Sequence, residues 1–164
     1  MALTVGTNSY VSLEDANSYF QSYTNSAWTG DDSDKESALM KATKYIDNNY
    51  YFIGYYIDGN ELAFPRSGVI ITKGNKYGKS YDDNTIPDEV KDATCEIAVY
   101  ALTNVLKPNK EAGFDLKKSS VGSLSEEYDV NSSSDPVYKT ARDILECLLD
   151  QSYSNSYAKP LSRW

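Results

Sequence analysis

Four segments of this chain carry apolar side chains at the three- and four-residue spacing of one helix face. A helix with such a stripe is stable in a protein when the stripe is buried against another element. The 164 residues suit one domain with one core. The sequence therefore predicts a mainly α fold, arranged as a four-helix bundle. The stripes are Leu13, Ala16, Tyr19 and Phe20; Leu39, Ala42, Tyr45 and Ile46; Ala93, Ile97, Ala98, Ala101, Leu102 and Val105; and Val137, Ala141, Ile144, Leu145, Leu148 and Leu149.

Capping residues predict where these helices begin. Ser12 and Asp15 suit the start of the first helix, and Ser33 with Glu36 forms a capping-box pattern before the second. The first two helices should end near residues 23 and 49. Pro87 suits the first turn of the third helix, which Pro108 ends, and residues 135–136 suit the start of the fourth. The third helix is the most apolar, so we expect it at the centre.

The segments between and after the helices differ in composition. Residues 50–87 are rich in Gly, Asp, Asn and Tyr, which predicts a small excursion of turns and short strands packed on the helices. Residues 114–130 alternate in places and favour a hairpin or a projecting loop. Residues 151–164 have no helical stripe and are rich in Ser, Asn and Tyr. We therefore predict a helical domain over residues 1–150 and an extended, flexible C-terminal tail over 151–164.

The charge balance bears on the kind of partner. The chain has 24 acidic and 16 basic residues, for a net charge of −8. Such a charge repels nucleic acid and anionic membranes unless a local basic patch reverses it. The only reversal found in the sequence is the tail, which holds Lys159 and Arg163 and no acidic residue. The domain and the tail are therefore expected to contact different partners.

Several classes of function lack the residues that they need. The chain has no histidine, the commonest general base and transition-metal ligand. Cys95 and Cys147 lie far apart within apolar helical patterns, which favours reduced core cysteines in a cytoplasmic protein. The acidic pairs at 31–32, 82–83 and 126–127 lack calcium-loop spacing and favour a solvated surface. We therefore expect no enzyme activity, cofactor, metal site, signal peptide or membrane span.

Tyrosine is the strongest compositional bias, with 15 tyrosines against four phenylalanines. Five aromatic residues fall within residues 50–56. They could stack on single-stranded bases, but such sites combine stacking with a cationic groove, and this segment has no Lys or Arg before Arg66. Tyrosine also suits protein interfaces, because its ring buries a large area while its hydroxyl stays polar. The protein-interface interpretation is favoured, and stacking on single-stranded bases stays open.

Several stretches, taken in order, resemble a known family. The chain is similar to tailed-phage head-tail connector (adaptor) proteins, often labelled DnaT-like single-stranded-DNA-binding proteins. Phe64 and Glu61 depart from the family pattern, in which Trp and Gln are usual. The stretches are Ser9-Tyr10-Val11-Ser12 leading to Ala16 and Tyr19-Phe20; residues 38–47; Phe52-Ile53-Gly54; Leu62-Ala63-Phe64-Pro65-Arg66; Ile86-Pro87 opening an Ala-rich helix; and Ser120-Val121-Gly122 to Tyr128.

The resemblance implies a structural role in the virion neck. It implies a subunit assembled in the host cytoplasm into a ring of about twelve copies. This ring would join the portal protein to the tail or a second neck protein, and genomic DNA would pass through without specific binding. Arg66 is expected to tether a loop to a carboxylate. The tail would bind the portal through Tyr157, Leu161, Arg163 and Trp164, since Arg and Trp are common in binding hot spots.

Two functions of different classes therefore stand side by side. The first is the connector subunit, which the acidic composition favours. The second is a single-stranded-DNA-binding replication accessory protein, as the family label suggests. A tail-side completion protein would differ from the first only in the neighbour that it touches. Oligonucleotide affinity that falls steeply with salt separates a DNA-binding protein from a connector.

Overall fold

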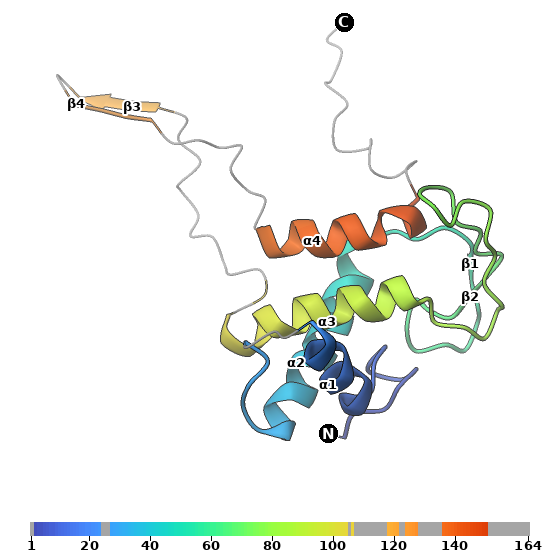
Figure 1. Ribbon diagram of the computed structural model, residues 1–164. Helices are drawn as coiled ribbons and strands as arrows, with labels where there is room; N and C mark the ends of the chain where they lie inside the picture. Colours follow the sequence, from blue (N-terminus) through green and yellow to red (C-terminus); the bar gives the residue numbers. More distant parts are fainter. Residues whose placement is uncertain are drawn as a thin grey trace, which may run out of the picture.

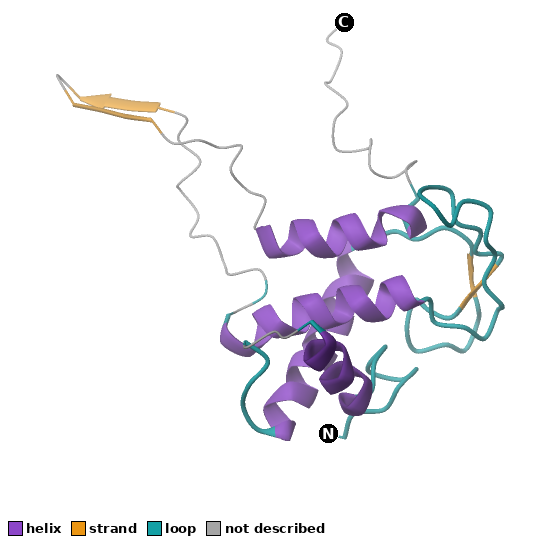
Figure 2. Cartoon of the chain, in the orientation of Figure 1, coloured by secondary structure: helices purple, strands orange, loops and turns teal. Residues whose placement is uncertain are grey.

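The computed structural model describes residues 2–23, 27–104, 106, 118–121, 124–127 and 136–150. This part of the chain is mainly helical (Figure 2), which confirms the predicted mainly α class. Its helices are α1 (Leu13–Ser22), α2 (Asp32–Asn49), α3 (Asp88–Thr103) and α4 (Pro136–Leu145), and a 3-10 turn over Glu146–Leu148 follows α4.

Helix α3 is central, as its composition predicts. It lies between α4 and α1, with α2 behind it (Figure 1), and it packs against all three. Small and branched side chains on several of its faces make this close approach feasible. The side chains of α3 that are almost completely buried are Val90, Ala93, Thr94, Cys95, Ile97 and Ala98.

The helix starts match the sequence in three cases and differ in one. Ser12 caps α1, and its Oγ accepts a hydrogen bond from the Asp15 amide at 3.0 Å. Pro87 precedes α3 directly, and α4 begins at Pro136. The predicted capping box at Ser33 is wrong, because Asp31 is the N-cap of α2 and Ser33 lies inside the first turn. Acidic residues in that turn still suit its positive end.

The excursion between α2 and α3 contains the predicted short strands. Strand β1 (Tyr55–Tyr56) pairs antiparallel with β2 (Arg66–Ser67). Two isolated bridges also involve the excursion, one between Ile70 and Ser80 and one at Phe52. The Phe52 bridge reaches Leu149, just after α4. The Phe64–Pro65 peptide bond is cis. The excursion contributes Phe52, Leu62, Phe64, Val69 and Ile71 to the core.

A second pair of strands lies between α3 and α4 in the sequence. Strand β3 (Lys118–Val121) pairs antiparallel with β4 (Leu124–Glu127), with Val121 opposite Leu124. The sequence left a hairpin or a projecting loop open over residues 114–130, and the paired strands agree with the hairpin. The predicted tail, residues 151–164, lies outside the described residues.

A buried tyrosine joins three distant parts of the chain. Tyr10 is fully buried, and its amide donates to the Thr43 hydroxyl in α2 at 3.2 Å. Its hydroxyl donates to the Asp47 carboxylate and accepts from the Phe64 amide at 3.3 Å. The other oxygen of Asp47 accepts from the Ala63 amide at 3.2 Å. The N-terminal arm, the end of α2 and the excursion therefore meet at one polar centre, called the Tyr10 centre below.

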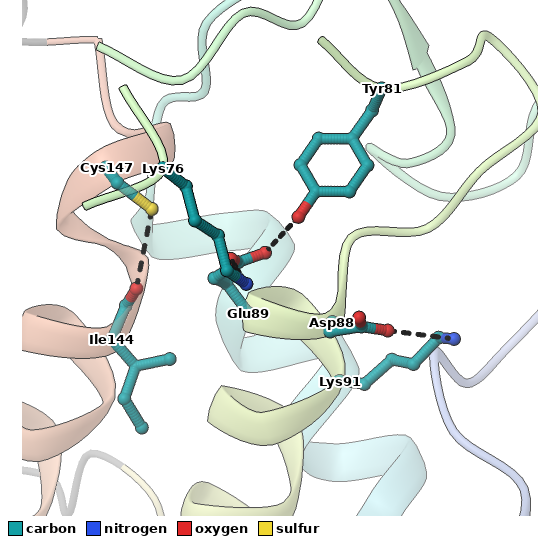
Figure 3. Close-up of polar contacts among 7 residues, drawn as sticks. All are labelled: Lys76, Tyr81, Asp88, Glu89, Lys91, Ile144 and Cys147. Atoms are coloured by element: carbon teal, nitrogen blue, oxygen red, sulfur yellow. Dashed lines mark hydrogen bonds and ion pairs between the residues drawn. The ribbon is translucent and has the colours of Figure 1, made fainter. Parts of the chain in front are cut away.

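The start of α3 is held to the excursion by a second polar group (Figure 3). Glu89 forms an ion pair with Lys76 at 2.7 Å and accepts from the Tyr81 hydroxyl at 2.7 Å. Burial of Glu89 favours its neutral form, but the hydrogen bonds from Lys76 and Tyr81 outweigh this and hold the pKa of Glu89 below its ordinary value. The carboxylate therefore stabilises the fold when it is ionised.

Gly54 and Gly59 allow a matched test of the excursion. Both have positive φ, at 78° and 94°, but a Cβ on Gly54 would lie 2.6 Å from the Ser67 carbonyl oxygen, and a Cβ on Gly59 would meet nothing within 4 Å. Gly59→Ala should lower the free energy of unfolding by about 1–2 kcal/mol, through backbone strain alone. Gly54→Ala should lower it by about 2 kcal/mol more, because a backbone atom must move. Denaturant titration compares the two, and equal losses would contradict the close approach.

Tyr81→Phe tests the hydrogen bond to Glu89. A depressed carboxylate pKa means that its stabilisation is present above the unfolded-state pKa and is lost as the pH falls through the folded-state pKa. The variant should lose about 1 kcal/mol of unfolding free energy near pH 7, and the loss should shrink below about pH 4. Tyr77→Phe is the control, since Tyr77 is 76% exposed. A loss in Tyr81→Phe that is constant from pH 3 to 7 would contradict this assignment.

Candidate nucleic-acid interface

Helix α2 carries a polar stripe on the side away from its buried stripe. Lys41, Lys44, Tyr45 and Asn48 follow the spacing that places residues on one helix face, and they are called the α2 face below. The buried residues of α2 are Ala38, Leu39, Ala42, Thr43 and Ile46. Packing of that apolar stripe against α3 therefore turns Lys41, Lys44 and Asn48 toward solvent, while Tyr45 at the edge of the stripe stays half-buried against the core.

The two lysines of the α2 face keep their charges available. Lys41 and Lys44 are exposed, and neither forms an ion pair with a described residue. Three other lysines are paired: Lys73 with Glu146, Lys76 with Glu89, and Lys91 with Asp88. A cation that forms no ion pair can neutralise a phosphate at little cost in existing contacts.

The α2 face forms one wall of an open cavity of about 490 Å³. Asn104 and Leu106, which follow α3, complete its lining together with Asn49. The Asn49 side chain donates to the backbone carbonyl of Tyr45 at 2.7 Å, which fixes the amide against the last turn of α2. The cavity therefore combines two cations, an aromatic ring and amide groups.

A second open cavity, of about 510 Å³, is called the polar pocket below. The two cavities share Asn48, so they are neighbours at the C-terminal end of α2. Side chains from three separate stretches of the chain meet here. The lining residues are Asp47, Asn48, Tyr50, Tyr51, Phe52, Gly54, Ala63, Arg66 and Asp150.

Arg66 anchors the wall of the polar pocket. Its guanidinium donates to the carbonyls of Ile53 at 2.9 Å, Gly54 at 2.9 Å and Phe52 at 3.3 Å. The sequence predicted a carboxylate partner for this loop tether, whereas these three partners are backbone carbonyls. Burial lowers the pKa of Arg66, but a guanidinium stays protonated in proteins. Arg66 therefore supplies a fixed positive charge and holds residues 52–54 in place.

Aromatic rings lead from the α2 face through the polar pocket to the core. The ring centroids of Tyr45 and Tyr50 lie 6.3 Å apart, those of Tyr50 and Phe52 6.5 Å apart, and those of Phe52 and Phe64 4.8 Å apart. Offset and edge-on pairs at such distances stabilise one another. Tyr51, at 57% exposure, adds a ring at the surface. Sites for single-stranded nucleic acid combine cationic side chains with aromatic rings.

Asp47 belongs to both the polar pocket and the Tyr10 centre. Burial raises the pKa of Asp47, while the hydrogen bonds from Tyr10 and Ala63 act in the opposite direction. Burial also raises the pKa of Tyr10, so its hydroxyl remains a proton donor. The carboxylate is thus held at a fixed position on the pocket wall.

Other chemistries find less support among the described residues. Within them, no group of three or more His, Cys, Asp or Glu side chains is placed to hold a metal ion. Burial raises the pKa of Cys95 to about 12, which keeps it a thiol in the core. Cys147 is half-buried and free. In the same ranges, no helix combines the length and hydropathy of a membrane span.

The residues singled out from the sequence are placed as follows. The polar pocket is lined by Arg66, Tyr50 and Tyr51. The tail residues predicted to bind a portal lie outside the described residues; they are Tyr157, Leu161, Arg163 and Trp164. The sequence patterns did not single out three residues of this site, Lys41, Lys44 and Asn48. Their spacing on the polar side of α2, opposite its apolar stripe, could have indicated them.

Comparison with known proteins identifies a family. The family described as "Putative DnaT-like ssDNA binding protein" has a sequence model that matches residues 2–163, nearly the whole chain. No curated protein matches, and no solved structure matches.

The head-tail connector interpretation is wrong by this finding, which supports the single-stranded-DNA-binding alternative instead. The predictions that depended on it are also wrong: the virion-neck assignment, the portal and ring partners, and the passage of DNA without binding. The connector interpretation came from the resemblance, and the preference for it came from the net charge of −8 and from finding no basic patch in the sequence outside the tail. Screening limits surface charges to about 10 Å at 0.1 M salt. Lys41 and Lys44 are exposed and form no ion pair with a described residue, so the α2 face presents two cations despite the net charge of the chain.

Proposed function

Because this chain belongs to the family described as DnaT-like ssDNA binding proteins, we propose that it binds single-stranded DNA across the α2 face and the polar pocket. The observation that carries this proposal is the pair Lys41 and Lys44, which are not ion-paired with described residues and line one cavity with Tyr45, while Tyr50 and Tyr51 line the neighbouring polar pocket. Lysines contact phosphates, and exposed rings stack on bases.

The arrangement favours a single strand over a duplex. Both cavities are concave and lined by aromatic and amide groups, so bases must be unstacked to reach them. A duplex would offer its phosphates to Lys41 and Lys44 but would keep its bases away from the rings. Stacking on a ring is worth about 1–3 kcal/mol per base, and only a single strand gains it.

The helices serve to position the binding site. We infer that the four helices act as a bundle whose packing sets the position of the α2 face, and that the protein functions by binding and not by catalysis. The absence of histidine from the chain supports this second point. A modest affinity is expected, because the net charge of −8 opposes the approach of DNA at low salt.

Removal of the two lysines tests the proposal. Fluorescence anisotropy of a labelled single strand of about 16 nucleotides measures the affinity at several salt concentrations. Lys41→Gln/Lys44→Gln should weaken binding at low salt by about tenfold or more and should reduce the slope of log K against log salt by about 1.4.

The matched control is Lys79→Gln/Lys91→Gln. It removes the same charge from residues that line neither cavity, so its affinity should stay near that of the unchanged protein. Absence of oligonucleotide binding by the unchanged protein at low salt would overturn the proposed function. Equal weakening in both double variants would place the site elsewhere.

A further inference from the structure

Arg66 binds a curved stretch of backbone beside the polar pocket. Its Nε donates to the Ile53 carbonyl at 2.9 Å, and its Nη2 donates to the carbonyls of Gly54 at 2.9 Å and Phe52 at 3.3 Å. Neighbouring carbonyls in a regular strand alternate in direction, so three that meet one guanidinium require a chain that curls around it. Gly54, with a φ of 78°, supplies the backbone conformation for this curl.

The same stretch is also held by the residues that follow α4. The Ile53 amide donates to the Leu148 carbonyl at 3.0 Å, and the Asp150 amide donates to the Tyr51 carbonyl at 2.9 Å. Together with Arg66, this segment supplies a hydrogen-bond donor to every carbonyl of residues 51–54. The backbone at this wall of the polar pocket is therefore ordered before any ligand enters.

This ordered backbone carries the exposed ring of the polar pocket. Phe52 is buried, with its ring centroid 4.8 Å from that of Phe64, whereas Tyr51 is 57% exposed. Successive side chains of an extended chain point to opposite sides, so burial of Phe52 directs Tyr51 outward. Because its backbone is already fixed, Tyr51 can stack on a base without a further loss of backbone entropy.

A direct contact with phosphate is the competing role for Arg66. Its remaining terminal nitrogen, Nη1, donates to no described residue. A phosphate contact would act on every strand, because it does not depend on the bases. Positioning of Tyr51 would act only on strands that have bases to stack. Three bonds to the backbone already use the other two nitrogens, which favours the positioning role.

We propose that Arg66 is a positioning residue for base stacking, because it holds residues 52–54 so that Tyr51 presents its ring to an unstacked base. This inference rests on the proposed function. Lysine at position 66 would keep the positive charge but would lack the planar fork that binds several acceptors at once. The freed carbonyls would bond to water instead, and the cost of ordering the segment again would oppose stacking. Arg66 therefore governs the contribution of the bases and not the attraction of the phosphates.

A comparison of two strands by fluorescence anisotropy tests this role. One is a single strand of about 16 nucleotides, and the other has the same length and phosphates but abasic sites throughout. The ratio of the two affinities measures what the bases contribute, and stacking should make it about tenfold or more in the unchanged protein. Arg66→Lys should lower this ratio at least about threefold, while the affinity for the abasic strand stays within about twofold.

Two further variants connect the effect to the Tyr51 ring. Tyr51→Ala should lower the ratio as Arg66→Lys does, and the double variant should lower it little further, because Arg66 acts through that ring. Arg142→Lys is the matched control, since Arg142 is exposed and lines neither cavity. Its ratio should equal that of the unchanged protein.

Several outcomes would overturn the inference and leave the proposed function standing. They are a ratio of about one in the unchanged protein, an unchanged ratio in Arg66→Lys, equal weakening of that variant toward both strands, and fully additive losses with Tyr51→Ala. A thermal melt verifies the fold, and loss of a cooperative transition in Arg66→Lys would mean that Arg66 supports the whole fold instead of one segment. If the unchanged protein binds neither strand, the proposed function fails, and the positioning role fails with it.

Discussion

The hydroxyl of Tyr10 meets the carboxylate of Asp47 at the edge of the core, where few water molecules compete for either group. The same hydroxyl accepts from the Phe64 amide, and the carboxylate accepts from the Ala63 amide. A polar group buried without partners costs more than its hydrogen bond gains, so these bonds hold the arm, α2 and the excursion in one register. The wall of the polar pocket follows from that register.

The position of the α2 face depends on the same packing. Burial of Leu39, Ala42 and Ile46 against the rest of the core leaves only one direction in which Lys41 and Lys44 can point. The rings of Tyr45 and Tyr50 then connect this face to the buried Phe52. An acidic protein can thus present a small cationic and aromatic surface, because local contacts and not the net charge determine what a strand meets.

Local patterns predicted the fold better than the site. The four apolar stripes identified the helices, since helical periodicity depends only on neighbouring residues. The start of α2 was misplaced, because several polar residues in a row offer competing caps, and Asp31 rather than Ser33 takes that place. For the site, the tyrosines were noticed, but the lysines that accompany them lie in α2 and not in the tyrosine-rich segment.

The sequence by itself determined the helical class, the central place of α3, the short strands of the excursion and the lack of histidine chemistry, because each depends on composition or on local spacing. Only the tertiary structure decided that Lys44, Tyr50 and Arg66 lie along neighbouring cavities, with Asp150 brought in from beyond α4. Residues so far apart in the chain meet only when the core has packed, and no local pattern contains that information.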